Sequence, residues 1–298
     1  MIIAGLAILC FAAALWAIAS VGAGPDSSTE VNQTSHRVEQ RLAKDSDVTF
    51  DRALSLEAID DLRTLELINH EHSMDVIALP EEMLKVGERV PASNPSIKLR
   101  AEALDASEAL FAAGHSAGLG PFQIVSGFRS WEHQSSLYEQ TQDKNLIQPP
   151  GHSEHHTGLA LDIVPTLVFQ SGSLSNQLDG GSEDEQWLAE NSWRYGLILR
   201  YPAGAQHFTG IAFEPWHFRY VGAPHAWYLW NYDLVLEEYL QFLSDSGGYD
   251  VNIDGRNYFV RWMQAQDGVV YVPDAKDFSI SSDNRGGYIV VAQTEASD

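Results

Sequence analysis

Apolar residues recur along the chain at two spacings, and these predict its helices and strands. A spacing of three to four predicts helices over residues 55–69, 99–113, 131–140, 182–193 and 224–243. Short apolar or alternating runs predict strands over residues 122–126, 159–164, 197–201, 211–220, 251–253, 257–260, 269–272 and 288–291. Gly114 is expected to stop the second helix, Ser130 to cap the third, and Asp254-Gly255 to turn a hairpin.

The order of these elements predicts the fold class. Helices and short strands are mixed without a regular strand–helix–strand rhythm. We therefore expect an α+β fold with a small antiparallel sheet flanked by helices. After Gly247 the pattern becomes purely β, which predicts a main domain over residues 49–246 and a short β extension over 247–298.

The N-terminal segment predicts export. Residues 2–24 carry no charge, and in a helix they would span roughly 30–35 Å, enough to cross a bilayer. They are typical of a signal peptide or a membrane anchor, although no Lys or Arg follows Met1. Both alternatives place the rest of the chain outside the cytoplasm, in the periplasm or cell envelope. The polar residues 25–48 are expected to form a linker.

Charge and cysteine content narrow the chemistry. The formal net charge of the 298 residues is −23, with 18 basic and 41 acidic residues. This balance argues against nucleic acid or an anionic membrane surface as a partner, because both bind basic surfaces. The single cysteine, Cys10, lies in the apolar leader, so a transition metal in the exported part would need His, Asp or Glu ligands. The eleven histidines make this feasible.

The densest cluster of reactive side chains is segment 151–162, GHSEHHTGLALD. Strand alternation places Ala160, Asp162 and Val164 on one face of the strand, where a buried carboxylate needs a cation or several donors. Histidines upstream of Gly158 could fold back to share a metal with that carboxylate. The alternative is an Asp that caps a turn beside solvated histidines.

A second cluster, Glu214-Pro215-Trp216-His217, would add another ligand and a carboxylate near the metal. A catalytic zinc needs three protein ligands and an open position for water, and an unligated carboxylate can accept the proton of that water. On a regular strand Glu214 and His217 would point to opposite faces. Since Pro215 cannot donate a ladder hydrogen bond, we expect a break or bulge there. Alone, the cluster could be a surface Glu and a packed His.

A third group is Ser126-Gly127-Phe128-Arg129-Ser130, with Gln134 one helical turn further on. Arg129 could bind a carboxylate or steady a developing oxyanion, or simply lie exposed at the helix start.

The chain resembles the D-alanyl-D-alanine carboxypeptidase (VanY) family of zinc peptidases over about residues 65–243. The resemblance rests on the pattern SxHxxGxAxD at 153–162 and ExWH at 214–217, and extends to segments 126–130, 195–202 and 218–222. It implies zinc held by His155, Asp162 and His217, with Glu214 as general base and then acid. It also implies that Arg129, Gln134 and Ser153 bind the terminal residue of the substrate.

The expected function is therefore zinc-dependent removal of the C-terminal D-alanine from peptidoglycan stem peptides, at a D,D or an L,D bond. Two alternatives stay open: an endopeptidase of the same fold, and a non-catalytic wall-binding module that keeps zinc for structure. Trp216 is expected in the pocket wall. His152 and His156 flank the presumed ligand His155, and each could be a hydrogen-bond donor behind the metal site or a solvent-exposed imidazole; we favour solvent exposure. His207 is the main rival ligand. The sequence leaves the oligomeric state open.

Overall fold

The computed structural model describes residues 41–42, 48–74, 82–142, 147–167, 174, 177–274 and 277–295. The α-helices of these residues are α1 (Ala101–Ser116), α2 (Trp131–Gln140), α3 (Glu183–Asn191), α4 (Gln206–Thr209), α5 (Ala223–Asn231) and α6 (Leu236–Ser246). Short 3-10 helices are η2 (Leu56–Ala58), η4 (Val86–Glu88), η6 (Glu154–Thr157) and η8 (Ser192–Tyr195).

The strands form small sheets whose paired strands run antiparallel. One sheet has the order β5 (Phe122–Ser126), β6 (Ala160–Pro165), β8 (His217–Tyr220), β7 (Leu197–Leu199). A second has the order β1 (Arg41–Leu42), β9 (Gly248–Ile253), β10 (Arg256–Gln264), β13 (Gly287–Glu295), β12 (Phe278–Ser282). Two pairs complete the set: β11 (Val269–Val272) with β2 (Arg52–Ser55), and β3 (Leu84–Lys85) with β4 (Lys98–Leu99). The expected α+β class with an antiparallel sheet is confirmed.

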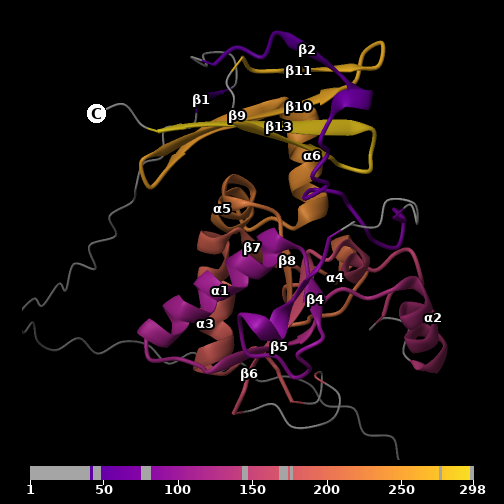
Figure 1. Ribbon diagram of the computed structural model, residues 1–298, viewed down its shortest axis with the longest axis vertical. Helices are drawn as coiled ribbons and strands as arrows, with labels where there is room; N and C mark the ends of the chain where they lie inside the picture. The colour runs from indigo at the N-terminus through magenta and orange to yellow at the C-terminus, as the bar shows by residue number, and fades with distance from the viewer. Residues whose placement is uncertain are drawn as a thin grey trace, which may run out of the picture. The chain divides into compact units, whose positions relative to one another are not determined.

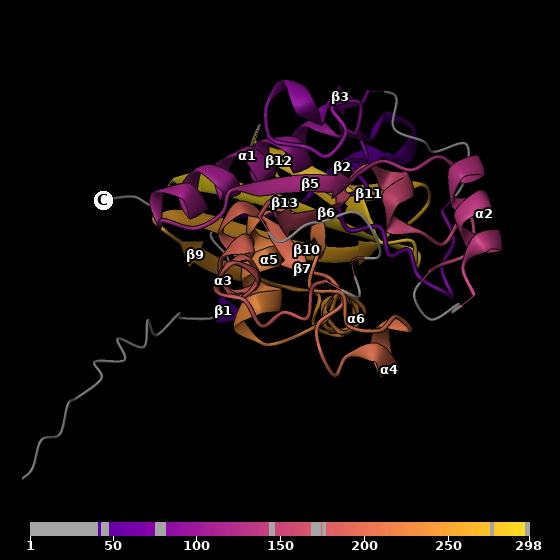
Figure 2. The same cartoon turned by 90° about the horizontal axis from the view of Figure 1, so that it is seen from below.

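The four-stranded sheet of β5, β6, β8 and β7 carries the candidate site and packs one face on α1. Leu159, Leu161 and Ile163 are buried there together with Leu104 and Leu110 of α1. The other face of β6 presents Asp162 and Val164, and Val164 packs with Trp216 in a separate small cluster. The predicted alternation of residues 159–164 is confirmed. Helix α2 stands to one side in both views (Figures 1 and 2).

The C-terminal strands share a hydrophobic core with the helices that precede them. In Figure 1, α5 and α6 lie between the sheet of β9, β10 and β13 and the strands β7 and β8. One cluster joins buried side chains of β7, α5, α6, β9, β10 and β13 with two from earlier segments: Leu65, Trp193, Ile198, Trp227, Leu240, Tyr249, Tyr258, Val260 and Ile289. The predicted hairpin is confirmed, since Ile253 pairs with Arg256 across Asp254 and Gly255.

Several predicted boundaries are wrong. Residues 55–69 form no long helix beyond the 3-10 turn Leu56–Ala58, because the amides of Leu62 and Leu67 donate to the distant carbonyls of Ile280 and Asp283. Arg63, in the left-handed region at φ 52°, would also interrupt a helix. The apolar residues of this segment instead face different clusters. Gly114 does not stop α1, which runs to Ser116; the glycine in the left-handed region is Gly118, just past the helix, at φ 83°.

The predicted helix over 224–243 is divided in two. Helix α5 ends at Asn231 and α6 begins at Leu236, with Asp233 in the left-handed region at φ 52°. A left-handed residue cannot continue a right-handed helix. The predicted strand over 211–220 is also shorter than expected, because only His217–Tyr220 pairs with β6 and β7.

The predicted leader 1–24 lies outside the described residues, as do most of the predicted linker residues 25–48. In the part of the chain that the structure describes, no helix has the length and apolar character needed to cross a bilayer.

Candidate metal centre and active-site pocket

Strands β6 and β8 bring two distant parts of the chain into direct register. Asp162 of β6 lies opposite His217 of β8 and, on the other side, opposite Ser126 of β5. His217 Nδ1 is 3.3 Å from Asp162 Oδ1. The two residues are 55 positions apart in sequence, and the antiparallel pairing of their strands places their side chains next to each other.

A turn over residues 214–217 places Glu214 beside the same histidine. The His217 amide donates to the Glu214 carbonyl at 3.2 Å, and the Glu214 amide donates to the Tyr201 carbonyl at 3.1 Å. Pro215 and Trp216 form the corner, and β8 begins only at His217. Glu214 Oε2 is 3.6 Å from His217 Nδ1. The expected break at Pro215 is present, and it turns both side chains toward one point.

His155 reaches the site from η6, the short helix directly before β6. Gly158 ends η6 in the left-handed conformation, at φ 69°, which returns the chain into the strand. His155 Nδ1 lies 2.8 Å from the carbonyl oxygen of Gly127. A donated hydrogen bond there leaves Nε2 with its lone pair toward Asp162 Oδ1, at 3.6 Å.

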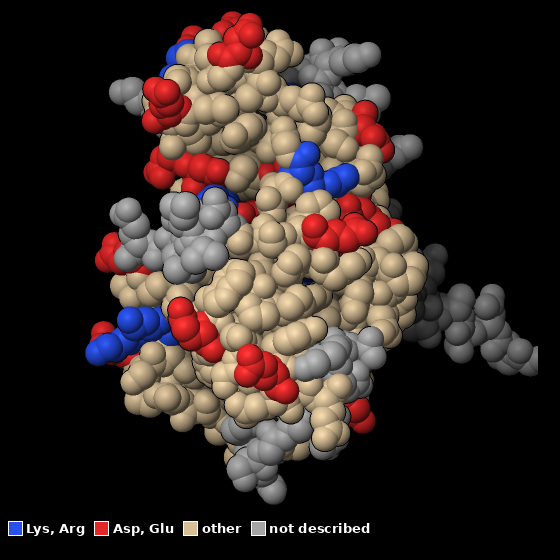
Figure 3. All heavy atoms as spheres, turned by 90° about the vertical axis from the view of Figure 1, so that its right-hand side faces the viewer, with Lys and Arg blue, Asp and Glu red and all other residues tan. Residues whose placement is uncertain are grey.

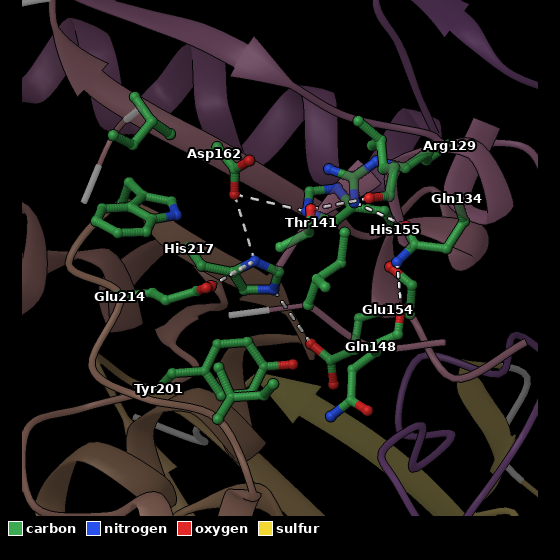
Figure 4. A pocket seen from close by; sticks show the side chains of 16 residues that line it. Arg129, Gln134, Thr141, Gln148, Glu154, His155, Asp162, Tyr201, Glu214 and His217 are labelled. Atoms are coloured by element: carbon green, nitrogen blue, oxygen red, sulfur yellow. Dashed lines mark hydrogen bonds and ion pairs between the residues drawn. The ribbon is translucent and has the colours of Figure 1, made fainter. Parts of the chain in front are cut away.

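These three side chains form a group that fits a divalent metal ion. His155, Asp162 and His217 each offer a ligand atom, and these atoms lie within 4.8 Å of one another. All three residues are at most 6% exposed, and Asp162 Oδ1 is buried without a hydrogen-bond partner among the described residues. Two imidazoles and one carboxylate are a common donor set for a catalytic zinc. Figure 4 shows the three side chains converging, with Glu214 beside them.

Burial and neighbouring charges tune the titratable groups of this site. Burial, opposed in part by His217, raises the pKa of Glu214 to about 7. Burial also lowers the pKa of His155 to about 4, and the nearby Arg129 guanidinium adds to this effect. Burial favours the neutral ring of His217, but the carboxylates of Asp162 and Glu154 outweigh it and raise its pKa to about 9. A carboxyl group whose pKa lies near 7 is suited to act as a general base at neutral pH.

His155, Asp162 and His217 line a cavity of about 400 Å³. Arg129, Gln134, Ser153 and Trp216, all predicted site residues, line it. Further lining residues are Leu137, Thr141, Ile147, Gln148, Glu154, Leu174, Tyr201 and Ile211. Figure 3 looks onto the side of the molecule on which α2 lies, where acidic side chains surround a largely uncharged central area. A cavity of this size admits one or two amino-acid residues of a peptide.

Arg129 is held in place by its neighbours. Its Nη1 donates to Gln134 Oε1 at 2.8 Å and its Nη2 to Ser126 Oγ at 3.1 Å. Gln134 is fully buried and donates through Nε2 to the Gln148 carbonyl. Gln134 therefore orients the arginine as well as lining the cavity. Ser130 caps α2, as expected, by accepting from the His133 amide at 3.2 Å.

The remaining histidines differ from expectation in their burial, since His156 is buried and His152 is half-buried. His207 is exposed and lies outside the metal group, next to the Gly204 carbonyl at 3.1 Å. His156 was expected in solvent but is 2% exposed, because Trp131 stacks on its ring and Arg129 and Gly151 meet its nitrogens. His152 lies half-buried with Nδ1 2.6 Å from the Asn69 carbonyl.

Sequence reasoning missed Glu154, Arg200, Tyr201 and Arg219. Tyr201 packs its ring 4.8 Å from that of His217. Glu154 forms buried ion pairs with Arg200 and Arg219. The signal was present, since both arginines interrupt apolar strand segments and buried cations require carboxylate partners.

Comparison with known proteins agrees with this geometry. Residues 96–223 match the family model described as VanY, D-alanyl-D-alanine carboxypeptidase. The chain is 36% identical over 174 residues to a D-alanyl-D-alanine carboxypeptidase of Enterococcus faecium, covering 58% of this chain but only about half, 54%, of that protein. It is 31% identical over 193 residues to the bifunctional D-Ala-D-Ala dipeptidase and carboxypeptidase VanXYC of Enterococcus gallinarum, covering 62% of this chain and 97% of that one.

A solved structure has the same fold. The vancomycin resistance D,D-dipeptidase VanXYg, in complex with a D-Ala-D-Ala phosphinate analog, aligns with a TM-score of 0.67 at 24% identity. The alignment covers 82% of this chain and 98% of that one. The motifs, the fold and the 31% identity over nearly the whole length of VanXYC together show that the chain belongs to the VanY family of D-alanyl-D-alanine carboxypeptidases.

Proposed function

We propose that the protein is a zinc-dependent carboxypeptidase that removes the C-terminal D-alanine from peptidoglycan stem peptides. The observation that carries the proposal is the convergence of His155, Asp162 and His217 within 4.8 Å, with Glu214 Oε2 3.6 Å from His217. The activities named for the VanY relatives support the substrate class.

Zinc is the metal proposed for this site. His155 Nε2, Asp162 Oδ1 and His217 Nδ1 would hold it, and all three residues line the cavity. Three protein ligands are the number found in catalytic zinc sites that also bind water. Bound zinc supplies Lewis acidity, which makes a water molecule a nucleophile near neutral pH.

The side chains of the chain then divide the work. Glu214 accepts the proton of the attacking water on its carboxylate and passes it to the departing D-alanine amine. Burial raises the pKa of Glu214 to about 7 in the metal-free site, and the same burial favours a carboxyl group that can hold the transferred proton. Arg129 provides the positive charge of the cavity and meets an anionic oxygen of the substrate, either the C-terminal carboxylate or the developing oxyanion.

The decisive experiment uses zinc-loaded protein and defined stem peptides. A pentapeptide ending in D-Ala-D-Ala and the corresponding tetrapeptide are incubated separately, and the products are weighed by mass spectrometry. Loss of one D-alanine from the pentapeptide identifies a D,D-carboxypeptidase, and loss from the tetrapeptide identifies cleavage of the L,D bond. Cleavage within the stem or a cross-link would identify the alternative endopeptidase. Zinc binding without any cleavage product would support the alternative of a non-catalytic wall-binding module.

We also propose that the protein acts outside the cytoplasm, in the periplasm or cell envelope. The uncharged segment 2–24 supports this location, because it has the length and composition of a signal peptide or anchor. Fractionation of cells that express the full chain tests the proposal, and N-terminal sequencing of the recovered protein separates cleavage from anchoring. Recovery of the uncleaved chain in the cytosol would contradict it.

A further inference from the structure

A buried carboxylate lies behind the candidate metal site, on the side of His217 that faces away from Asp162. Glu154 belongs to η6 and is 1% exposed. Its Oε1 accepts a hydrogen bond from Arg200 Nε at 2.8 Å and forms an ion pair with Arg219 Nη1 at 3.0 Å. Both arginines are at most 1% exposed. One oxygen of Glu154 therefore satisfies two buried cations.

The other oxygen of Glu154 faces the imidazole of His217. Glu154 Oε2 and His217 Nε2 are 3.6 Å apart, and neither has a hydrogen-bond partner among the described residues. Figure 4 shows the His217 ring between the two groups, with one nitrogen toward Asp162 and Glu214 and the other toward Glu154. A ring shift of a few tenths of an ångström would bring the pair to hydrogen-bond distance.

We propose that Glu154 is a positioning residue for His217: its Oε2 accepts the Nε2–H and so fixes the ring with Nδ1 toward the metal. This inference rests on the proposed function, because it concerns the ligand role of His217. A histidine that ligates a metal through one nitrogen carries its proton on the other, and an acceptor there fixes both the tautomer and the ring orientation. Glu154 is the group placed to do so here.

The arginines make this acceptor rigid. Arg200 also donates through Nη1 and Nη2 to Glu237 of α6, at 2.9 and 2.7 Å. Arg219 donates through Nη2 to the carbonyls of Thr64 and Glu66, at 3.0 and 3.1 Å. Each guanidinium is thus held from two sides. If the carboxylate of Glu154 rotated away from His217, Arg200 Nε and Arg219 Nη1 would lose their buried carboxylate partner, which is strongly unfavourable.

This arrangement also explains why an amide cannot replace the carboxylate. In Glu154→Gln, the side-chain oxygen could face either the arginines or His217, and the amide N–H groups would face the other. Both the guanidinium groups and the Nε2–H are donors. Either orientation therefore opposes two donors, so the acceptor for His217 or the partner of Arg200 is lost.

The test compares Glu154→Gln with the matched control Glu66→Gln. Glu66 is a buried carboxylate at 2% exposure that contributes to the charge around Arg219, but its side chain pairs with Arg63. The zinc Kd of each folded variant is measured by competition with a chelator. Glu154→Gln should weaken zinc binding about 10–100-fold, as loss of such partners does elsewhere, whereas Glu66→Gln should change it less than about threefold. Equal Kd values for Glu154→Gln and the unsubstituted protein would overturn the inference.

A measurement on the unsubstituted protein keeps the inference testable if Glu154→Gln does not fold. The ¹⁵N shifts of His217 in the zinc-loaded protein should report a metal on Nδ1 and a hydrogen-bonded proton on Nε2. Coordination through Nε2 would overturn the inference while leaving the proposed function intact. Failure of the unsubstituted protein to take up zinc would instead overturn the proposed function, and this inference with it.

Discussion

Charged side chains in otherwise apolar strands define the chemistry of this protein at the scale of single residues. Asp162 stands between Leu161 and Ile163, and Arg200 and Arg219 follow or interrupt apolar strand residues. All three are buried. Because an unpaired buried charge is strongly unfavourable, each of them implies a partner. Asp162 faces two histidines, and the arginines meet on Glu154.

Replacement of the proposed general base should separate metal binding from catalysis. Glu214→Gln removes the proton acceptor without removing a proposed ligand, so we expect zinc to stay stoichiometric while kcat falls about 10²–10⁴-fold. Metal analysis and steady-state release of D-alanine measure the two effects. Unchanged turnover by this variant would exclude Glu214 as the base.

Replacement of a proposed ligand should instead remove the bound metal. His155→Ala or His217→Ala leaves two of three protein ligands, so the zinc content should fall from roughly one ion per chain to near none. His207→Ala, at the exposed rival position, is the matched control and should keep the ion. Stoichiometric zinc in both ligand variants would refute the assigned set.

The pKa of His217 predicts how zinc affinity depends on pH. The metal-free ring has a pKa of about 9, so it is mainly protonated at neutral pH and must lose its proton to bind the ion. His155, with a pKa of about 4, is already neutral there. Zinc affinity should therefore rise with pH, by about tenfold per unit between roughly pH 6 and 9. A Kd that stays constant over this range, measured with a pH-corrected chelator, would contradict the expectation.

At the scale of elements, the junction of η6 and β6 sets the geometry of the site. Gly158 ends η6 at φ 69°, and the chain enters β6 two residues later at Ala160. The short turn allows His155 and Asp162 to face one another from consecutive elements. The turn over 214–217 does the same for Glu214 and His217, so each half of the site is a corner next to a strand.

A side chain at Gly158 should destabilise this junction. A Cβ there would meet Met83 Cε at 2.5 Å and Sδ at 2.6 Å, in addition to the strain of the left-handed backbone. Gly158→Ala should cost at least the backbone strain of about 1–2 kcal/mol of unfolding free energy. Displacement of the flexible end of Met83 and the contact with Arg100 Cγ at 3.2 Å should add to this cost.

Gly118→Ala provides the matched control for this substitution. Its φ is 83°, and a Cβ there would meet no atom within 4 Å, so only the backbone strain of about 1–2 kcal/mol applies. Urea unfolding of both variants gives the difference. Equal losses would show that Met83 moves aside without cost.

At the scale of the whole molecule, the C-terminal strands are part of the core that supports the site. Tyr249 donates to the Pro224 carbonyl at 2.9 Å and lies 3.0 Å, oxygen to oxygen, from Tyr239. The Leu65 amide donates to Ser281 Oγ at 2.8 Å. From α6, Glu237 reaches Arg200 and hence Glu154. The predicted extension 247–298 is thus packed on the elements that hold the site.

Truncation after residue 246 should therefore unfold the protein. It would remove Tyr249, Tyr258, Val260 and Ile289 from the shared cluster, and each buried side chain contributes about 1.5–3 kcal/mol. The sum of these losses, about 6–12 kcal/mol, is comparable with the whole stability of a typical domain, about 5–15 kcal/mol. Circular dichroism and zinc binding of the truncated and full chains measure the outcome. A folded, zinc-binding truncation would show that the extension is dispensable.

The sequence alone determined which residues form the two halves of the candidate site, and most of the local structure. The spacing of His155 and Asp162 and of Glu214 and His217 marked both halves of the site. The periods of 99–113, 122–126 and 131–140 predicted α1, β5 and α2. These features follow from local rules, since strand alternation and helix caps depend on neighbours within a few positions.

Tertiary structure decided what depends on pairing between distant segments. Residues 55–69 have helical spacing, yet the Leu62 amide donates to the Ile280 carbonyl, more than two hundred positions away. The register of Asp162 with His217 and the meeting of Glu154 with two arginines are likewise set by the sheet. Such contacts leave only a buried charge or an apolar face as their trace in the sequence, because the identity of the partner is fixed when the chain folds.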